Sequence, residues 1–368
     1  MYSQNDLDEA VAAGAISADS AAALRGFVET QRALPGVDEE HFRLITGFND
    51  IFVSIASAIL LFAVGWIGQS IGQSTGLVIE GDGPSPLAPL AIAATAWGLA
   101  LFFTAKRRMA LPSIMLLLAF VGGVFAAAAF AQVLIVGEPP NDQAALVAGI
   151  VGSISGAVAT AAAWLHWRRF KVPITIAAGA AAVAAVAIGL LIAVLGDPEP
   201  YQNTIWSFVL LLGIGVFLFA MRWDSSDPAR VTRRSDVAFW LHLLAAPMIV
   251  HPVFTLLGLN DGTATIGEGL VVIALYVALG LTALAIDRRA LLVSALAYVL
   301  YALSELFKQV GGVELNIALT ALVIGSALLL LSAYWHQARA MVVHRLPAGL
   351  RAHLPNLDRV AAIPEPAA

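Results

Sequence analysis

Long apolar runs separated by short polar segments make up most of the chain. The runs are continuous rather than alternating, which predicts helices and excludes a membrane-spanning β-barrel. A bilayer core of about 30 Å requires roughly 20 apolar residues per helix, so the sequence predicts an all-α integral membrane helical bundle with about ten transmembrane helices. The predicted spans cover residues 51–71, 87–105, 111–136, 144–165, 172–195, 204–221, 237–258, 269–286, 290–308 and 315–335.

The polar connections between the predicted spans alternate in charge. One set is basic, as in residues 106–108 and 288–289, whereas the other set carries acidic residues such as Glu80 and Glu138. Nineteen of the 20 Lys and Arg residues fall on the first side, and the twentieth is Lys308. Because basic loops stay in the cytoplasm, both termini are predicted to be cytoplasmic and the number of spans to be even.

Composition supports the membrane class: 60% of residues are hydrophobic and only 12% are charged. The absence of cysteine excludes disulfides, thiolate metal sites and cysteine nucleophiles. The acidic start MYSQNDLDEA lacks the basic-then-apolar order of a signal peptide, so the first span is expected to act as its own insertion signal. With the Ala-rich spans, these features predict a multi-pass protein of a bacterial inner membrane.

The polar ends predict two further regions around the transmembrane domain, which covers residues 50–336. Residues 1–49 are expected to form a cytoplasmic helical region, in which Gly14 ends a first helix and Ser17 caps a second. Residues 337–368 are expected to form a cytoplasmic tail.

The predicted span 290–308 carries an unusual polar stripe. At 100° per residue, the side chains of Ser294, Tyr298, Tyr301, Glu305 and Lys308 fall within an arc of about 80°. Such a stripe is expected to face protein or water rather than lipid. Two interpretations stay open, an ion pair at the outer end of a helix or a polar cavity that binds a ligand or protons.

The span FWLHLLAAPMIVHPVF contains Pro247 and Pro252, which predict a kinked or broken helix. His251 lies between them at the predicted depth of Glu305, so the two residues are candidates for one shared site. His242 lies nine residues earlier, on the opposite side of a straight helix. The alternative is a packing kink in which His251 contacts a neighbouring carbonyl.

Two other features predict packing rather than chemistry. Gly152 and Gly156 form a small-xxx-small pair, which favours close helix packing within the chain, with a dimer face as the alternative. His166 lies beside Trp164 and Trp167 and is expected at the membrane interface.

Common catalytic and cofactor motifs are missing. The sequence contains no Walker A loop or HExxH pattern, and no GxGxxG that opens a helix after a strand. An intramembrane enzyme acting on lipid is therefore the least favoured function, no cofactor or metal site is expected, and the basic turns offer no nucleic-acid-binding face. The expected partners are membrane lipids and either other membrane subunits or a second copy of the chain.

The segment LDEAVAAGAISADSAAALRGFVE, residues 7–29, resembles the short helical pair that precedes the spans in a group of uncharacterised bacterial polytopic membrane proteins, classed as domains of unknown function. The ten-span layout also looks like that of drug/metabolite transporters, in topology alone. Two functions are therefore hypothesised. The first is a transporter or permease-like protein for a small solute or lipid, in which Glu305, His251, Tyr298, Tyr301 and Lys308 bind the ligand or protons. The second is a non-catalytic membrane scaffold or accessory subunit.

Overall fold

The computed structural model describes residues 11–24, 48–227, 232–258, 266–289 and 316–351, together with Leu292, Leu296, Val299, Leu300, Leu303 and Leu354. Within these residues the regular elements are all helices, which confirms the all-α class. The elements are α3 (Phe48–Thr75), α4 (Leu87–Phe103), α5 (Ala110–Val136), α6 (Ala144–Phe170), α7 (Ile174–Leu195), η1 (Glu199–Tyr201), α8 (Gln202–Ser225), α9 (Arg233–Leu256), α10 (Ile266–Ile286), α12 (Asn316–Ala333), α13 (Trp335–His344) and α14 (Ala348–Arg351).

The described helices are those of a multi-pass membrane protein. By length and composition, 7 of them can cross a membrane, or up to 8 if α12 and α13, which meet at 75°, count as one span. Helix α4 is apolar but slightly shorter, at 17 residues. Each predicted span coincides with a described helix over most of its length except 290–308, most of which lies outside the described residues. The count of ten spans stays a prediction.

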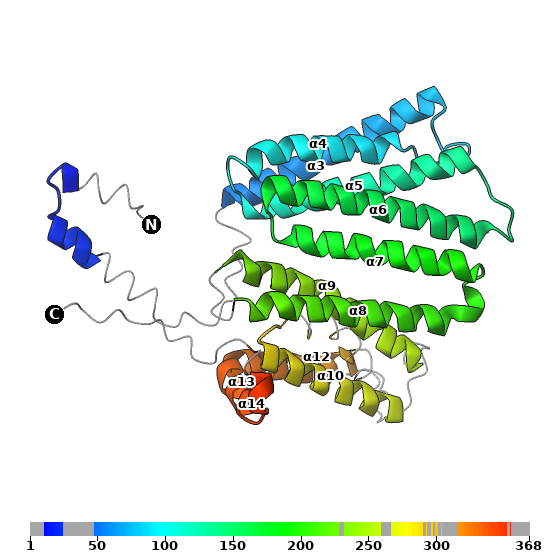
Figure 1. Ribbon diagram of the computed structural model, residues 1–368. Coiled ribbons are helices and arrows are strands. Elements are labelled where there is room, and N and C mark those ends of the chain that lie inside the picture. Colours follow the sequence, from blue (N-terminus) through cyan, green and yellow to red (C-terminus); the bar gives the residue numbers. More distant parts are fainter. Residues whose placement is uncertain are drawn as a thin grey trace. The chain divides into compact units, whose positions relative to one another are not determined.

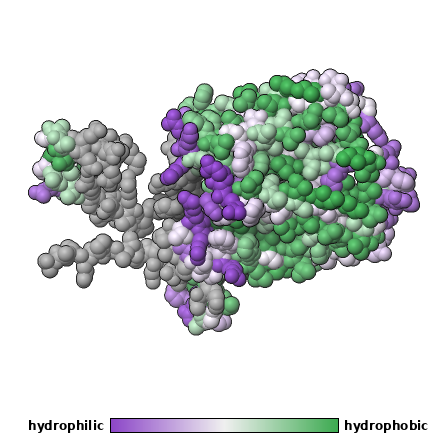
Figure 2. Space-filling model, turned by 45° about the horizontal axis from the view of Figure 1, so that its top comes forward, coloured by the Kyte–Doolittle hydropathy of each residue, from purple (hydrophilic) through white to green (hydrophobic). Residues whose placement is uncertain are grey.

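Successive helices from α3 to α10 reverse direction, and neighbours in sequence pack against each other from α3 through α9 (Figure 1). The basic turns therefore gather at one end, here named the basic end, and the acidic turns at the other, the acidic end. Figure 2 shows a hydrophobic surface between these hydrophilic ends on the face it draws. The basic end carries Lys106, Arg107, Arg108, Arg168, Arg169, Lys171, Arg222, Arg233, Arg234, Arg288 and Arg289, and the acidic end carries Glu80, Asp82, Glu138, Asp142, Asp197 and Glu199.

The turns follow local sequence. Gly137 ends α5 with φ 70° and Gly196 ends α7 with φ 74°, a region of φ that costs glycine little. Lys171 ends α6 with φ 56°, and its N–H donates to the Trp167 carbonyl. These ends make the short hairpin turns that keep the helices antiparallel.

Helices α6 and α7 pack with close backbone contact. A Cβ added to Gly149 would lie 2.5 Å from the Gly189 carbonyl oxygen, and one added to Gly156 would lie 2.9 Å from the Ala182 carbonyl oxygen. A Cβ added to Gly152 would meet nothing within 4 Å. Gly156 thus serves packing within the chain, whereas Gly152 takes no part in that contact.

Helix α9 was expected to be kinked or broken; the structure contradicts the break, and the kink stays a prediction. It runs unbroken from Arg233 to Leu256 with both prolines inside. Pro252 removes the hydrogen bond that the Met248 carbonyl would accept. That carbonyl faces α8, where a Cβ on Gly213 would lie 2.7 Å from its oxygen. Half of the apolar stretch of α9 is buried, so packing against neighbouring helices holds the helix together across both prolines.

Residues 11–24 are described by themselves. Gly14 has φ 72°, and its N–H donates to the Val11 carbonyl, which ends a first helical turn. The Ser17 hydroxyl accepts a 3.1 Å hydrogen bond from the Ser20 N–H, and residues 18–24 are helical. Both expected capping roles are confirmed.

Candidate functional site: a buried ion cluster

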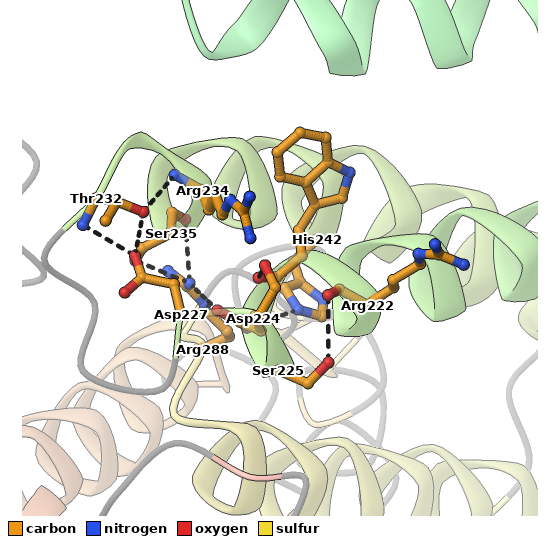
Figure 3. A network of polar contacts seen from close by, with 11 residues as sticks. Arg222, Asp224, Ser225, Asp227, Thr232, Arg234, Ser235, His242 and Arg288 are labelled. Carbon is orange, nitrogen blue, oxygen red and sulfur yellow. Dashed lines mark hydrogen bonds and ion pairs between the residues drawn. The ribbon is translucent and has the colours of Figure 1, made fainter.

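Three ionisable side chains from separate parts of the chain meet at the basic end, and together they form the ion cluster (Figure 3). Asp224 lies in the last turn of α8, His242 on α9, and Arg288 two residues beyond the end of α10. The Asp224 carboxylate accepts hydrogen bonds from Arg288 Nη2 at 2.5 Å and Arg288 Nε at 3.2 Å. His242 Nε2 lies 3.2 Å from Asp224 Oδ2. Their exposed fractions are 1%, 0% and 2%, so the cluster is closed to solvent.

The start of α9 is fixed by a second carboxylate in the same connection. Asp227 Oδ2 accepts from the Thr232 N–H at 2.9 Å and from its hydroxyl at 2.7 Å. The Thr232 hydroxyl oxygen in turn accepts from the Arg234 N–H, which caps the helix. Ser235 follows in the first turn, and both its carbonyl (3.1 Å) and its hydroxyl (3.4 Å) accept from Arg288 Nη2.

The end of α10 directs Arg288 into the cluster. Asp287 has φ 57°, its N–H donates to the Leu284 carbonyl, and the Arg288 N–H donates to the Ala283 carbonyl. This is the Schellman arrangement of a helix C-terminus, with aspartate where glycine is usual. The strained φ is compensated because the Asp287 carboxylate accepts a 2.7 Å hydrogen bond from Trp335 Nε1 on α13.

Consecutive residues therefore tie α10 to different neighbours. Arg288 joins it to α8 and α9, whereas Asp287 joins it to α13 through Trp335 and through Arg339 Nε at 3.8 Å. The Arg289 guanidinium lies 4.7 Å from the Trp335 ring centroid, a cation–π contact. Helix α10 thus links the α8–α9 hairpin to α13 at the basic end (Figure 1).

The cluster places an imidazole within hydrogen-bond distance of a carboxylate that is also paired with a guanidinium. With His242 neutral, ionised Asp224 and Arg288 cancel in charge; with His242 protonated, the cluster carries one net positive charge. Imidazole is the side chain whose charge changes near neutral pH. Among the described residues, no group of three His, Asp or Glu side chains is arranged to hold a metal ion.

Of the predicted site residues, only His251 is described. It is half-buried on α9, with its ring 4.7 Å from the Trp206 ring in an edge-to-face contact. Its carbonyl accepts from the Thr255 hydroxyl at 2.9 Å. Tyr298, Tyr301, Glu305 and Lys308 lie outside the described residues. The site shared by Glu305 and His251 therefore stays a prediction.

The interfacial depth of His166 stays a prediction, and the structure shows that its side chain faces the interior of the bundle. Its side chain is fully buried at 0% exposure, among the rings of Trp97, Phe120 and Phe170. Nδ1 lies 3.2 Å from the Thr175 hydroxyl, and Nε2 is buried without a hydrogen-bond partner among the described residues. Trp164 and Trp167 lie on other faces of α6 than His166. Their positions therefore did not predict the surroundings of the His166 side chain.

Sequence reasoning missed the ion cluster, although one signal was present. Asp224 is an acidic residue in the last turn of a helix, where the helix dipole disfavours negative charge. Such a residue needs a cationic partner. The partner is Arg288, which lies 64 positions away along the chain. Only the tertiary structure could identify it.

Comparison of the chain with protein-family models, with curated proteins and with solved structures found no match. The described apolar helices define the class as an all-helical multi-pass membrane protein.

Proposed function

We propose that the protein is a permease-like transporter of a small solute or lipid, with ten spans and both termini on the cytoplasmic side of a bacterial inner membrane. In this proposal the ion cluster is a gate that closes the cytoplasmic end. The observation that carries the proposal is the buried Asp224–Arg288–His242 contact between α8, α9 and the end of α10.

Energetics favour a switching role for this contact over a purely stabilising one. Replacing a buried ion pair by apolar residues is often neutral or stabilising, because desolvation offsets the attraction between the charges. A contact that is strong when paired and costly when broken is suited to holding one of two conformations.

The position of the cluster supports the same role. Helices α8 and α9 pack closely along their backbones, whereas α10 meets them mainly through side chains. In Figure 1, α10 and α12 form a group beside the α8–α9 hairpin. Transporters commonly alternate access by rocking one helix group against another. The ion cluster lies where such groups would separate.

Helix α9 relates the gate to the predicted binding site. His242 and His251 are nine residues apart, about 13 Å along the helix axis. His242 contacts the gate at the basic end, and His251 lies toward the acidic end, where Glu305 is also predicted. A helix that carries both histidines can couple protonation at one end to opening at the other.

Thiol accessibility tests the gate, and the cysteine-free sequence needs no background substitutions. Ala246 is fully buried on α9, one turn beyond His242. In inverted membrane vesicles, the variant Ala246→Cys should react slowly with a membrane-impermeant maleimide, and Asp224→Asn should accelerate this reaction severalfold. Ala96→Cys, equally buried on α4, is the matched control and should stay unreactive.

A scaffold gives a different result. If position 246 stays as unreactive as position 96 in folded Asp224→Asn protein, the cluster is no gate and the scaffold function is favoured. Transport itself is measured in pyranine-loaded proteoliposomes with a panel of solutes and lysolipids. Solute-dependent proton flux in the wild type that is lost in Asp224→Asn and in Glu305→Gln supports the transporter. Flux that is unchanged in both variants excludes these carboxylates from coupling.

A further inference from the structure

A cavity of about 140 Å³ lies apart from the ion cluster, between α10, α12 and the start of α13. Four of its eight lining residues are leucines: Leu328 and Leu331 on α12, and Leu292 and Leu296 from the chain that follows α10. An apolar cavity of roughly 150 Å³ is large enough to take up benzene. This cavity therefore accommodates an apolar group of about six carbons.

The lining of the cavity includes a residue from the interior of α10 and one from just beyond its end. Tyr276 lines one part of it, ten residues before the end of the helix at Ile286, which is about 15 Å along the axis. Arg289, which also lines it, lies beyond that end. A lining that combines a residue within the span with an arginine at its basic end suits an apolar chain that enters from the level of the headgroups.

The mouth of the cavity at the basic end is polar and cationic. The Arg289 guanidinium stacks on the Trp335 ring, and Trp335 is held in place by its hydrogen bond to Asp287. Ser332, which is exposed, adds a hydroxyl beside them. Arginine over a tryptophan at the end of a span is the arrangement expected at the level of lipid headgroups.

We infer that this cavity binds a segment of about six carbons of one acyl chain of an anionic phospholipid from the surrounding bilayer, with the phosphate of that lipid beside Arg289. The leucine wall takes the chain, which adds apolar burial, and the guanidinium pairs with the phosphate. Charge complementarity selects an anionic over a zwitterionic headgroup, because the basic end concentrates positive charge around the mouth. The lipid then bridges α10 and α12 next to the link between α10 and α13. This inference is independent of transport, since a scaffold could hold the same lipid.

The test counts lipids retained by the purified full-length protein. The protein is reconstituted with phosphatidylglycerol or with phosphatidylcholine, extracted in mild detergent and weighed by native mass spectrometry. Leu328→Trp fills the cavity, and Arg289→Gln removes the charge at its mouth. Each should lower phosphatidylglycerol retention by about tenfold. The matched controls are Leu329→Trp, which is 74% exposed on the same helix, and Arg345→Gln, which is exposed at the same end. Both should retain lipid like the wild type.

A second measurement covers the case in which Leu328→Trp fails to fold. Brominated acyl chains quench the fluorescence of a nearby indole. Brominated phosphatidylglycerol should therefore quench the fluorescence of Trp335, which is measured as the difference between the wild type and Trp335→Phe. Arg289→Gln should reduce this quenching. The inference is overturned if folded Leu328→Trp and Leu329→Trp retain equal lipid. It is equally overturned if the wild type retains phosphatidylcholine as well as phosphatidylglycerol, or if brominated lipid leaves Trp335 unquenched.

Discussion

The substitution Arg288→Met removes the cation from the ion cluster while keeping a long apolar side chain. Asp224 then loses two charge-assisted hydrogen bonds, those at 2.5 and 3.2 Å, and keeps its contact with His242. Hydrogen bonds to charged groups contribute about 1.5–3 kcal/mol each, so the loss is about 3–6 kcal/mol. Breaking a buried ion pair costs about 3–5 kcal/mol in other proteins, which agrees with this range.

The assay is unfolding by sodium dodecyl sulfate in mixed micelles, followed by tryptophan fluorescence. Arg345→Met, at an exposed arginine of the same end, is the control and should change the free energy of unfolding by less than about 0.5 kcal/mol. The double variant Asp224→Leu with Arg288→Met removes both charges. It should recover most of the lost stability, because no unpaired charge is left buried.

Two results would refute this reasoning. In the first, Arg288→Met lowers the free energy of unfolding by less than about 1 kcal/mol, as for an exposed ion pair. In the second, the double variant loses the sum of the two single losses, which shows that the side chains act independently.

Three further predictions concern packing and topology. Gly213→Ala should destabilise the protein by about 1–3 kcal/mol, because its Cβ would lie 2.7 Å from a carbonyl of α9, whereas Gly215→Ala, with open space around it, should be neutral or stabilising in the same unfolding assay. Tyr276→Phe should leave the melting temperature unchanged or raise it, because the buried hydroxyl has no hydrogen-bond partner among the described residues; a clear decrease would contradict this. Asp82→Cys and Lys106→Cys should react with an impermeant maleimide from opposite sides of the membrane, and labelling of both from one side would contradict the positive-inside assignment.

The spans and their alternation could be predicted from the sequence because they depend on local properties. A run of about 20 apolar residues has few alternatives to a helix in a bilayer. The basic turns at 106–108 and 168–171 mark one end of the helices wherever those helices pack. The caps at Gly14 and Ser17 are equally local, since each involves residues within one turn.

The effect of the prolines in α9 was not predictable in this way. Pro247 and Pro252 each remove one backbone donor, which predicts a break when the helix is considered alone. In the fold, the Met248 carbonyl that Pro252 leaves without its helical donor lies against Gly213 of α8. Neighbouring helices bury half of the apolar stretch of α9. Packing with another helix decided the outcome.

The sequence by itself determined that this is an all-helical membrane protein with basic residues at one end of its helices, because hydrophobic length and charge bias act segment by segment. The tertiary structure decided the surroundings of each histidine. Helical periodicity assigns a residue to a face of its own helix, but it does not tell which helix covers that face. Only the folded chain brings His242 to Asp224 and Arg288, leaves His251 beside Trp206 and encloses His166 among aromatic rings.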